Sequence, residues 1–303
     1  MDSRGCLKKG FVDNKIIHIS DKELKKLHKI LIMMLRDFDS VCKKYNIHYS
    51  LGGGSVLGAV RHGGIIPWDD DIDINISRED YNKLLQTFAK YTGSKYSVYA
   101  PEIGGGHGLA CSQIKLNGTV YRSYNELSKS SADSGICIDL FVIENTFDNP
   151  IMRGIHGILC LCFGYMLTCR KTYQDYQEIV KYVDKRSKAY RLFKLKNIIG
   201  RLFSWIDIDT LTRMTAKIYS MCHNNYSKYV TVPTGRKHFW GELYKRDVLC
   251  ETISVCFGSA NTYIPTKSDI YLKKLYGENY MEIPKQMDQE SHPIMEINFG
   301  RYK

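Results

Sequence analysis

The chain has 303 residues, of which 44% are hydrophobic and 25% charged, a composition that is typical of a globular protein and excludes a disordered or fibrous one. Its 43 basic and 32 acidic side chains give a formal charge of +11, which favours anionic partners such as nucleotide diphosphates, lipid surfaces or nucleic acid. Ten cysteines without a CxxC pair, and an amino-terminal segment without the apolar stretch of a signal peptide, predict reduced thiols and a cytoplasmic location.

The first predicted element is a long amphipathic helix. Ser20–Glu23 has the form of a capping box, and apolar residues then recur at helical spacing as far as Tyr45. A short strand is expected at 48–51, and it runs into the glycine turn, Gly52–Ser55, and a second helix over 56–61. The sequence therefore predicts a strand, a glycine turn and a helix in direct succession.

An acidic run follows this helix after a Gly-Gly turn and a Pro-Trp pair. Asp69, Asp71 and Asp73 share one parity, and isoleucines alternate with them in the second half of the run, which predicts a strand with carboxylates on one face. Close carboxylates repel one another unless a cation neutralises them, and an oxygen-rich cluster suits Mg²⁺ or Mn²⁺. The alternatives are a solvated acidic edge and a calcium loop, although Ile74 stands where a calcium loop needs glycine.

The rest of the chain divides into three parts by pattern. Residues 1–150 mix helical and strand patterns, with further strands expected at 96–99, 110–116 and 136–143. Residues 151–230 are helical in pattern, and residues 231–303 are mixed again, with a helix over 268–276 that ends at Gly277. We therefore predict an α+β protein with a catalytic core, a helical insertion and a carboxy-terminal part that completes the catalytic domain.

The glycine turn offers the second component of a phosphate site. A strand that runs into Gly53, Gly54 and Ser55 at the start of a helix lets backbone N–H groups approach phosphate oxygens. Phosphoryl chemistry needs such a cradle together with a metal that bridges phosphate oxygens. The alternative is a flexible loop that is unrelated to the acidic run.

The stretch 51–76, LGGGSVLGAVRHGGIIPWDDDIDINI, closely resembles the signature of the LicD family. The resemblance continues more thinly through 138–141 and 263–284, and it does not extend over the helical part. It implies a nucleotidyltransferase-like mixed sheet with flanking helices. It also implies transfer of a phosphorylated group, above all phosphocholine from CDP-choline, onto a sugar hydroxyl of a cell-surface glycan or glycolipid such as lipopolysaccharide or teichoic acid.

For the site, the resemblance implies that Asp71 and Asp73 hold the catalytic metal, with Asp69 as a further carboxylate, and that the glycine turn contacts the donor's phosphates. Asp139 is similar to the third carboxylate of the fold, which either ligates the metal or takes the proton from the acceptor hydroxyl. The alternative for Asp139 is a structural acid at the end of a strand.

Further residues are candidates for binding the substrate. Arg61, His62 and Lys115 could neutralise charge on the transferred phosphate, and the alternatives are a helix-end arginine, a packed histidine and a solvated strand lysine. His292 is expected to close over the site. A choline cargo would be held by aromatic faces, and the candidates in the family-like region are Trp240, Tyr244, Tyr276 and Tyr280. The alternative for each of them is packing in the core, which is the more common role of such residues.

The helical part raises the question of a membrane. Residues 151–168 are apolar, but Arg153, His156 and Arg170 leave an uncharged stretch shorter than the ~20 residues that a span needs, so we expect a buried or interfacial helix. The segment 181–201 is basic and interleaved with apolar residues. It predicts either a solvated helix or peripheral contact with anionic lipid at the inner face of the membrane.

Two rival functions stay open. A true nucleotidyltransferase would use the same metal and glycine turn to attach a nucleoside monophosphate to a small molecule, a protein or RNA. A basic nucleic-acid-binding module without catalysis would account for the charge of +11. Nucleic acid is the less favoured partner, because carboxylates on one face repel a phosphate backbone.

Overall fold

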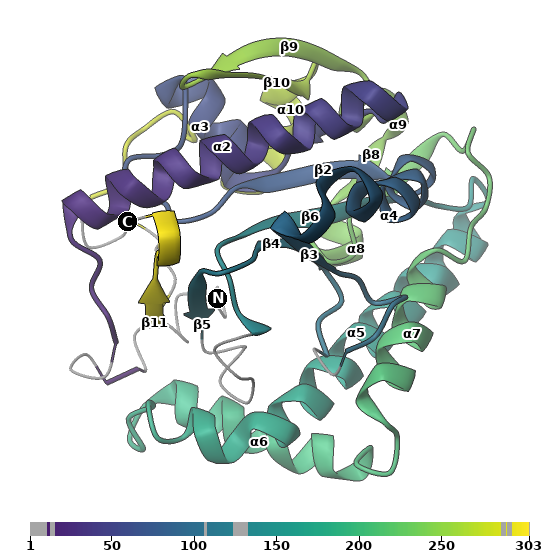
Figure 1. Ribbon diagram of the computed structural model, residues 1–303. Coiled ribbons are helices and arrows are strands. Elements are labelled where there is room, and N and C mark those ends of the chain that lie inside the picture. The colour runs from purple at the N-terminus through teal and green to yellow at the C-terminus, as the bar shows by residue number, and fades with distance from the viewer. Residues whose placement is uncertain are drawn as a thin grey trace.

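The computed structural model has the α+β fold that the sequence predicts, with a central mixed sheet and helices on either side of it (Figure 1). The structure describes residues 11–12, 16–105, 108–123, 133–285, 289 and 293–302. In Figure 1, helix α2 (Asp21–Tyr45) lies above the sheet, and the helical region that follows residue 149 lies below it.

A parallel pair of strands forms the centre of the sheet. β2 (Asp73–Ser77) pairs with β6 (Cys137–Asn145) in a register that sets Asp73 opposite Asp139. The strand order is β1-β2-β6-β4-β3, and β7 joins the far end of β6 and pairs with β8. These outer strands all run antiparallel to their neighbours: β1 (Tyr49–Leu51), β3 (Tyr96–Tyr99), β4 (Ser112–Leu116), β7 (Tyr229–Thr231) and β8 (Leu243–Lys245).

The second half of the acidic run is the strand that the alternation predicts. Ile72, Ile74 and Ile76 are fully buried in the main core, whereas Asp71 and Asp73 are only half-buried. β2 itself starts at Asp73, so the earlier aspartates lie in an irregular connection rather than in the strand. The isoleucines therefore fix which way the carboxylates of this segment point.

Two helices with sequence-coded caps cover one face of the sheet. In α2 the predicted capping box is present, since the Ser20 hydroxyl accepts from the Glu23 N–H and the Glu23 carboxylate accepts from the Ser20 N–H. In α4 (Arg78–Thr92) the Ser77 hydroxyl accepts from the Asp80 N–H. The apolar stripes of both helices are buried, and they pack against each other and against β6.

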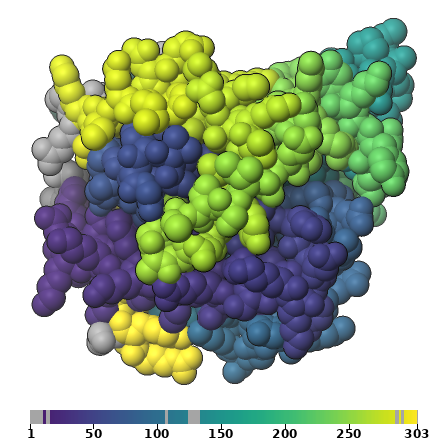
Figure 2. All heavy atoms as spheres, turned by 90° about the horizontal axis from the view of Figure 1, so that it is seen from above, coloured from purple at the N-terminus to yellow at the C-terminus, as the bar shows by residue number. Residues whose placement is uncertain are grey.

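The carboxy-terminal part returns to the central sheet and its flanking helices, where α10 (Ser268–Tyr276) packs against α3 (Gly53–His62). The predicted end of α10 is confirmed, because Gly277 caps it with a φ of 92° that only glycine adopts readily. Figure 2 shows a hairpin from this part lying across α2 and beside α3. The hairpin and the other short elements are β9 (Thr252–Phe257), β10 (Ala260–Pro265), α8 (His238–Gly241), α9 (Arg246–Leu249), β5 (Val120–Ser123) and its antiparallel partner β11 (Ile294–Asn298).

Three helices form the helical region between residues 150 and 219: α5 (Pro150–Ile179), α6 (Lys188–Leu202) and α7 (Ile208–Tyr219). They bury small apolar clusters of their own, separate from the main core. By length and composition alone α5 could cross a membrane, and only 22% of its most apolar window is buried. Of the two expectations for this segment, a buried or an interfacial helix, the low burial contradicts the first. The domain boundaries at 150 and 230 stay a prediction, and so does the cytoplasmic location inferred from the cysteines, all of which are free in the described part of the chain.

Candidate active site

Three carboxylates converge where β2 and β6 begin. One oxygen from each of Asp71, Asp73 and Asp139 lies within 4.8 Å of the others. The parallel register of the two strands causes this convergence, because it places Asp73 and Asp139 side by side with Asp71 two positions earlier on the same face. Three carboxylates this close repel one another when all are ionised, and hard oxygen ligands of this kind could hold Mg²⁺ or Mn²⁺.

Asp139 is held in place by the neighbouring strand. Its Oδ1 accepts a hydrogen bond of 2.9 Å from Nε2 of Gln113, which faces it across the β4–β6 pair. This hydrogen bond orients the carboxylate toward Asp71 and Asp73. Gln113 carried no signal in the sequence, because only the pairing of β4 with β6 brings it to Asp139.

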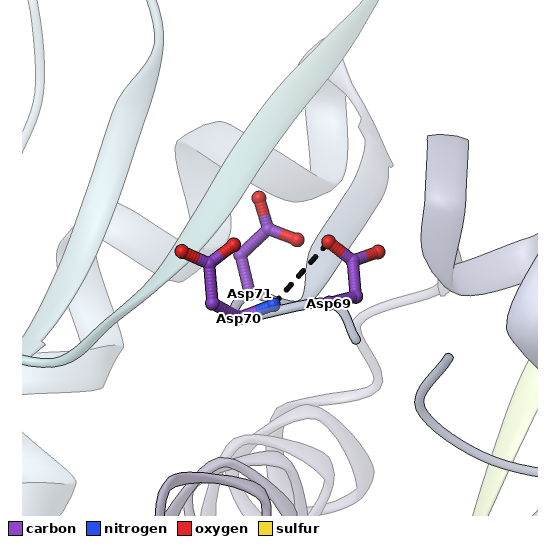
Figure 3. A group of neighbouring side chains, drawn as sticks. All are labelled: Asp69, Asp70 and Asp71. Atoms are coloured by element: carbon purple, nitrogen blue, oxygen red, sulfur yellow. Dashed lines mark hydrogen bonds between the residues drawn. The ribbon is translucent and has the colours of Figure 1, made fainter. Parts of the chain in front are cut away.

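Asp69 belongs to a second, overlapping group. Its carboxylate lies with those of Asp70 and Asp71, again within 4.8 Å, as Figure 3 shows, and the Asp70 N–H donates to Asp69 Oδ1 at 3.3 Å. The predicted set of four ligands is thus divided, with Asp71 shared between the two groups. Asp70 was not among the sequence candidates. It is buried and accepts a hydrogen bond from the hydroxyl of Tyr121, whose pKa is raised by burial so that the phenol stays protonated.

The glycine turn lies directly against these acids. A Cβ atom at Gly53 would come within 2.5 Å of Asp73 Oδ2, and one at Gly54 would come within 3.0 Å of Asp69 Oδ2. The Asp73 N–H donates to the Ser55 hydroxyl at 2.9 Å, and the Gly52 N–H donates to the Asp73 carbonyl at 2.8 Å. A side chain at Gly53 would displace the Asp73 carboxylate, and one at Gly54 would crowd Asp69, so the glycine turn and the acids form one continuous site.

A tyrosine from the carboxy-terminal part holds the turn. The Gly53 N–H donates to the hydroxyl oxygen of Tyr271 at 2.8 Å, and the Asn75 amide donates to the same oxygen at 3.3 Å. Tyr271 is fully buried, and burial raises its pKa. The Gly53 amide is thus engaged within the protein, whereas Gly54 and Ser55 lie in the first turn of α3, where N–H groups have no acceptor in their own helix.

Arg61 and His62 point to the edge of this site rather than into it. Arg61 Nη1 donates to the carbonyl oxygens of Tyr280 and Glu282 at 2.9 and 3.0 Å, so it fastens the segment after α10. Burial and the adjacent Arg61 lower the pKa of His62, which keeps its imidazole neutral near pH 7. His62 lines a hollow of about 580 Å³ with His28 and Arg36. The carboxylates described above (Asp69, Asp70, Asp71, Asp73 and Asp139), which we call the acidic cluster, do not line this hollow. A role for either residue at the transferred phosphate stays a prediction.

Lys115 lies on the sheet face that carries Asp139. It is two residues after Gln113 on β4, and it is buried, with 5% of its surface exposed. Its Nζ donates to the Asp133 carbonyl at 3.3 Å. A solvated strand lysine, the alternative from the sequence, is therefore wrong, because this ammonium is enclosed near the carboxylates. His292 lies outside the described residues.

Tyr276 is the one aromatic candidate that the described structure places at the site. Its hydroxyl is 3.9 Å from the position of a Cβ at Gly54, and its pKa is raised by burial first, then by Tyr271 and by the charges of Asp73 and Asp69. The guanidinium of Arg236 lies over its ring at 5.5 Å. Sequence reasoning missed Arg236, which follows β7 in a loop that carries no motif.

The other three aromatic candidates have different contacts. Trp240 packs beside Gly157 of α5, where a Cβ would be 2.5 Å from its ring. Tyr244 is buried against Tyr271, with ring centroids 5.5 Å apart. The Tyr280 hydroxyl donates to Asp269 at 2.9 Å. These three residues therefore pack or cap elements of the fold.

Residues 46–148, which run from β1 to just beyond β6, match the family model described as LicD/FKTN/FKRP, nucleotidyltransferase domain. The chain is 38% identical over 79 residues to the lipopolysaccharide cholinephosphotransferase LicD of Haemophilus influenzae, covering 26% of this chain and 30% of that protein. It is 31% identical over 146 residues to protein RP689 of Rickettsia prowazekii, covering 46% and 45%. It is 46% identical over 54 residues to the human ribitol 5-phosphate transferase FKRP, covering 18% and 11%. The chain thus spans less than half the length of each of these relatives.

Proposed function

Residues 46–148 are a LicD family domain, and on this premise we propose that the protein is a phosphotransferase that moves a phosphate-linked group from an activated donor onto a sugar hydroxyl of a glycan. The observation that carries the proposal is the contact between the glycine turn and the acidic cluster, where a Cβ at Gly53 would meet Asp73 at 2.5 Å. Phosphoryl transfer needs a group that binds the phosphate oxygens and a metal site that contacts the same phosphates, so the glycine turn and the acids must lie side by side.

The donor set fits a divalent cation, Mg²⁺ or Mn²⁺. Asp71, Asp73 and Asp139 would hold it, with Asp69 close enough to Asp71 to join through a shift of the connection or through water. When bound, such an ion neutralises charge on the donor's diphosphate.

The chain's own groups would position the reacting atoms. We expect the first-turn N–H groups of Gly54 and Ser55 to bind phosphate oxygens, with Lys115 and Arg236 as cations at the edges of the same site. The sugar oxygen forms a bond to the phosphorus nearest the cargo, and the bond from this phosphorus to the leaving CMP oxygen breaks. The hydroxyl proton passes to a carboxylate, for which Asp139 is the candidate.

CDP-choline is the donor that we propose. Of the relatives described above whose names state a function, the cholinephosphotransferase is matched over the longer stretch of this chain. A choline cargo needs an aromatic face, and the candidate is Tyr276, whose hydroxyl lies beside the glycine turn; the cargo would use the ring face opposite Arg236. A ribitol phosphate cargo would instead need hydrogen-bond partners for its hydroxyls.

The test is incubation of the protein and a glycan acceptor with CDP-choline, CDP-ribitol, CTP or ATP, each with Mg²⁺, followed by mass analysis of the products. Phosphocholine on the acceptor with release of CMP is the expected result. A nucleoside monophosphate on the acceptor with release of pyrophosphate would instead identify a nucleotidyltransferase. The variants Asp71→Asn and Asp73→Asn should be inactive but folded, and retained transfer would refute the role of the acidic cluster.

A further inference from the structure

The helices α5 and α6 carry apolar stripes that the folded chain leaves uncovered. On α5, Ile151 is 73% exposed, Ile155 47%, Ile158 59% and Tyr165 49%, and these positions recur at helical spacing on one face. On α6, the exposed apolar residues Leu195 (50%), Ile198 (55%) and Leu202 (68%) form a second stripe, and Trp205 (80%) extends it just past the helix end. Contiguous exposed apolar residues of this kind mark an interaction surface.

The two stripes face the same direction. Cys169 and Tyr173 lie on the same face of α5 as the exposed stripe, further along the helix. α6 packs on α5 at these two residues, because a Cβ at Gly200 would lie 2.1 Å from the Cys169 carbonyl oxygen and 2.7 Å from Tyr173. α6 turns Ala189, Phe193 and Gly200 inward, so its exposed stripe is on the side away from α5. In Figure 1, α6 lies at the lower margin of the molecule, away from α2.

Positive charge accompanies the apolar stripe of α6. Arg191, Lys194 and Arg201 are exposed and fall on the same helical face as Leu195, Ile198 and Leu202. From residue 185 to 206 the sequence holds seven basic residues and no acidic one. In the described part of the chain, the ion pairs do not include Arg191, Lys194 or Arg201. The surface therefore combines apolar anchors, an interfacial tryptophan and uncompensated cations.

We propose that this surface, defined by Ile151, Ile155, Ile158 and Tyr165 of α5, by Arg191–Leu202 of α6 and by Trp205, docks the protein on an anionic lipid bilayer. The positive charge favours a bilayer over a protein partner with a neutral surface. Lysine and arginine can contact the phosphates of lipid head groups while the neighbouring leucine, isoleucine and tryptophan contact the acyl chains below them. The helices lie in the interface and do not cross it. The packing of α6, α7 and α8 on α5 supports this orientation, because these contacts would be lost if α5 entered the bilayer alone.

The inference goes beyond the proposed reaction and does not depend on it, so vesicle binding tests it without any measurement of activity. Vesicles of phosphatidylcholine alone, and with about one third phosphatidylglycerol, are mixed with the full chain at low and high salt and separated by flotation. Binding to the anionic vesicles at low salt, release at high salt and a blue shift of tryptophan fluorescence are expected. The blue shift should disappear in Trp205→Ala.

Charge variants give the expected size of the effect. Each basic residue near an anionic surface contributes about a fivefold gain in partition, so Arg191→Gln, Lys194→Gln and Arg201→Gln together should weaken binding about 100-fold. Lys22→Gln, Lys25→Gln and Lys90→Gln together are the control, because these three lysines are exposed on α2 and α4 and should leave binding unchanged.

Apolar variants give an independent check. Ile155→Ser with Ile158→Ser should weaken binding, whereas Ile253→Ser with Ile270→Ser, two residues that are 46% and 51% exposed on β9 and α10, should not. Equal loss in the test and control variants, or equal binding to neutral vesicles, would overturn the proposal. Resistance to carbonate extraction would overturn it in favour of a spanning α5. Salt-sensitive binding to RNA without binding to vesicles would overturn it in favour of a nucleic-acid surface.

Discussion

The replacement Gly53→Ala probes the contact between the glycine turn and the acids. The φ of Gly53 is +42°, a left-handed conformation that costs a residue with a Cβ about 1–2 kcal/mol. Alanine also reduces the conformational entropy of the unfolded chain, which stabilises the folded state by about 0.4–1 kcal/mol. The net loss of stability from the backbone is therefore about 1 kcal/mol. The new Cβ would lie 2.5 Å from Asp73 Oδ2, and ordinary contact begins at 3.4 Å, so this oxygen must move by about 0.9 Å.

A displacement of about 1 Å in a catalytic group lowers a rate by about 100-fold, and Gly53→Ala should therefore lose transfer far beyond its loss of stability. Gly63→Ala is the matched control, because Gly63 has a φ of +67° at the other end of the same helix and a Cβ there would meet nothing within 4 Å. Thermal unfolding and initial transfer rates are measured for both variants. Wild-type activity in Gly53→Ala, or an equal loss of activity in Gly63→Ala, would refute the reasoning.

Three further changes test the fold around the site. Tyr271→Phe removes the acceptor of the Gly53 N–H, so stability should fall by about 1 kcal/mol in chemical denaturation and the transfer rate should fall as well. Gly200→Ala forces a Cβ to within 2.1 Å of the Cys169 carbonyl oxygen, which should cost about 1–3 kcal/mol by overpacking and should loosen α6 in hydrogen exchange. Burial lowers the pKa of His156 below 6.5, so the unfolded chain binds its proton first and stability should fall as the pH drops through 6.5, with a shallower slope in His156→Gln.

Two of these variants, Gly200→Ala and Tyr271→Phe, have a matched control. Gly154→Ala places a Cβ in open space on α5 and should not destabilise the protein. Tyr226→Phe removes a hydroxyl from a side chain that is 92% exposed and should change neither stability nor rate. Stability that rises as the pH falls from 7 to 6 would contradict the assignment of a neutral His156.

The sequence predicts the parts of the site that lie within one local pattern. The alternation of aspartate with isoleucine determines which way Asp71 and Asp73 point, and the glycine turn is recognisable because only a few residues separate it from a strand and a helix. What a local pattern cannot supply is the pairing of distant segments. Gln113, Tyr271 and Arg236 reach the site through sheet register or packing across the chain, and none has a motif of its own.

For Lys115 and α5 the structure decides between alternatives that the sequence leaves open, and the reason lies in the residues that surround each of them. The sequence leaves Lys115 either as a phosphate-binding candidate or as a solvated strand lysine, and the second is excluded because β4 lies inside the sheet and Lys115 is buried. The charges in α5 argue against a span and leave a buried or an interfacial helix open, but they do not show which face is exposed. In the structure His156 is buried against Phe239 and Arg153 lies over the ring of Tyr229, so the outer face of this helix is left apolar. The exposure of a helix face depends on what the rest of the chain covers, which no window of sequence contains.

The most direct test of the metal assignment is the anomalous diffraction of Mn²⁺ in crystals of the protein. A single strong peak is predicted between the carboxylates of Asp71, Asp73 and Asp139, at about 2.0–2.3 Å from their oxygens, and it should be absent in Asp73→Asn. A peak remote from these three residues, or none at saturating Mn²⁺, would contradict the assignment.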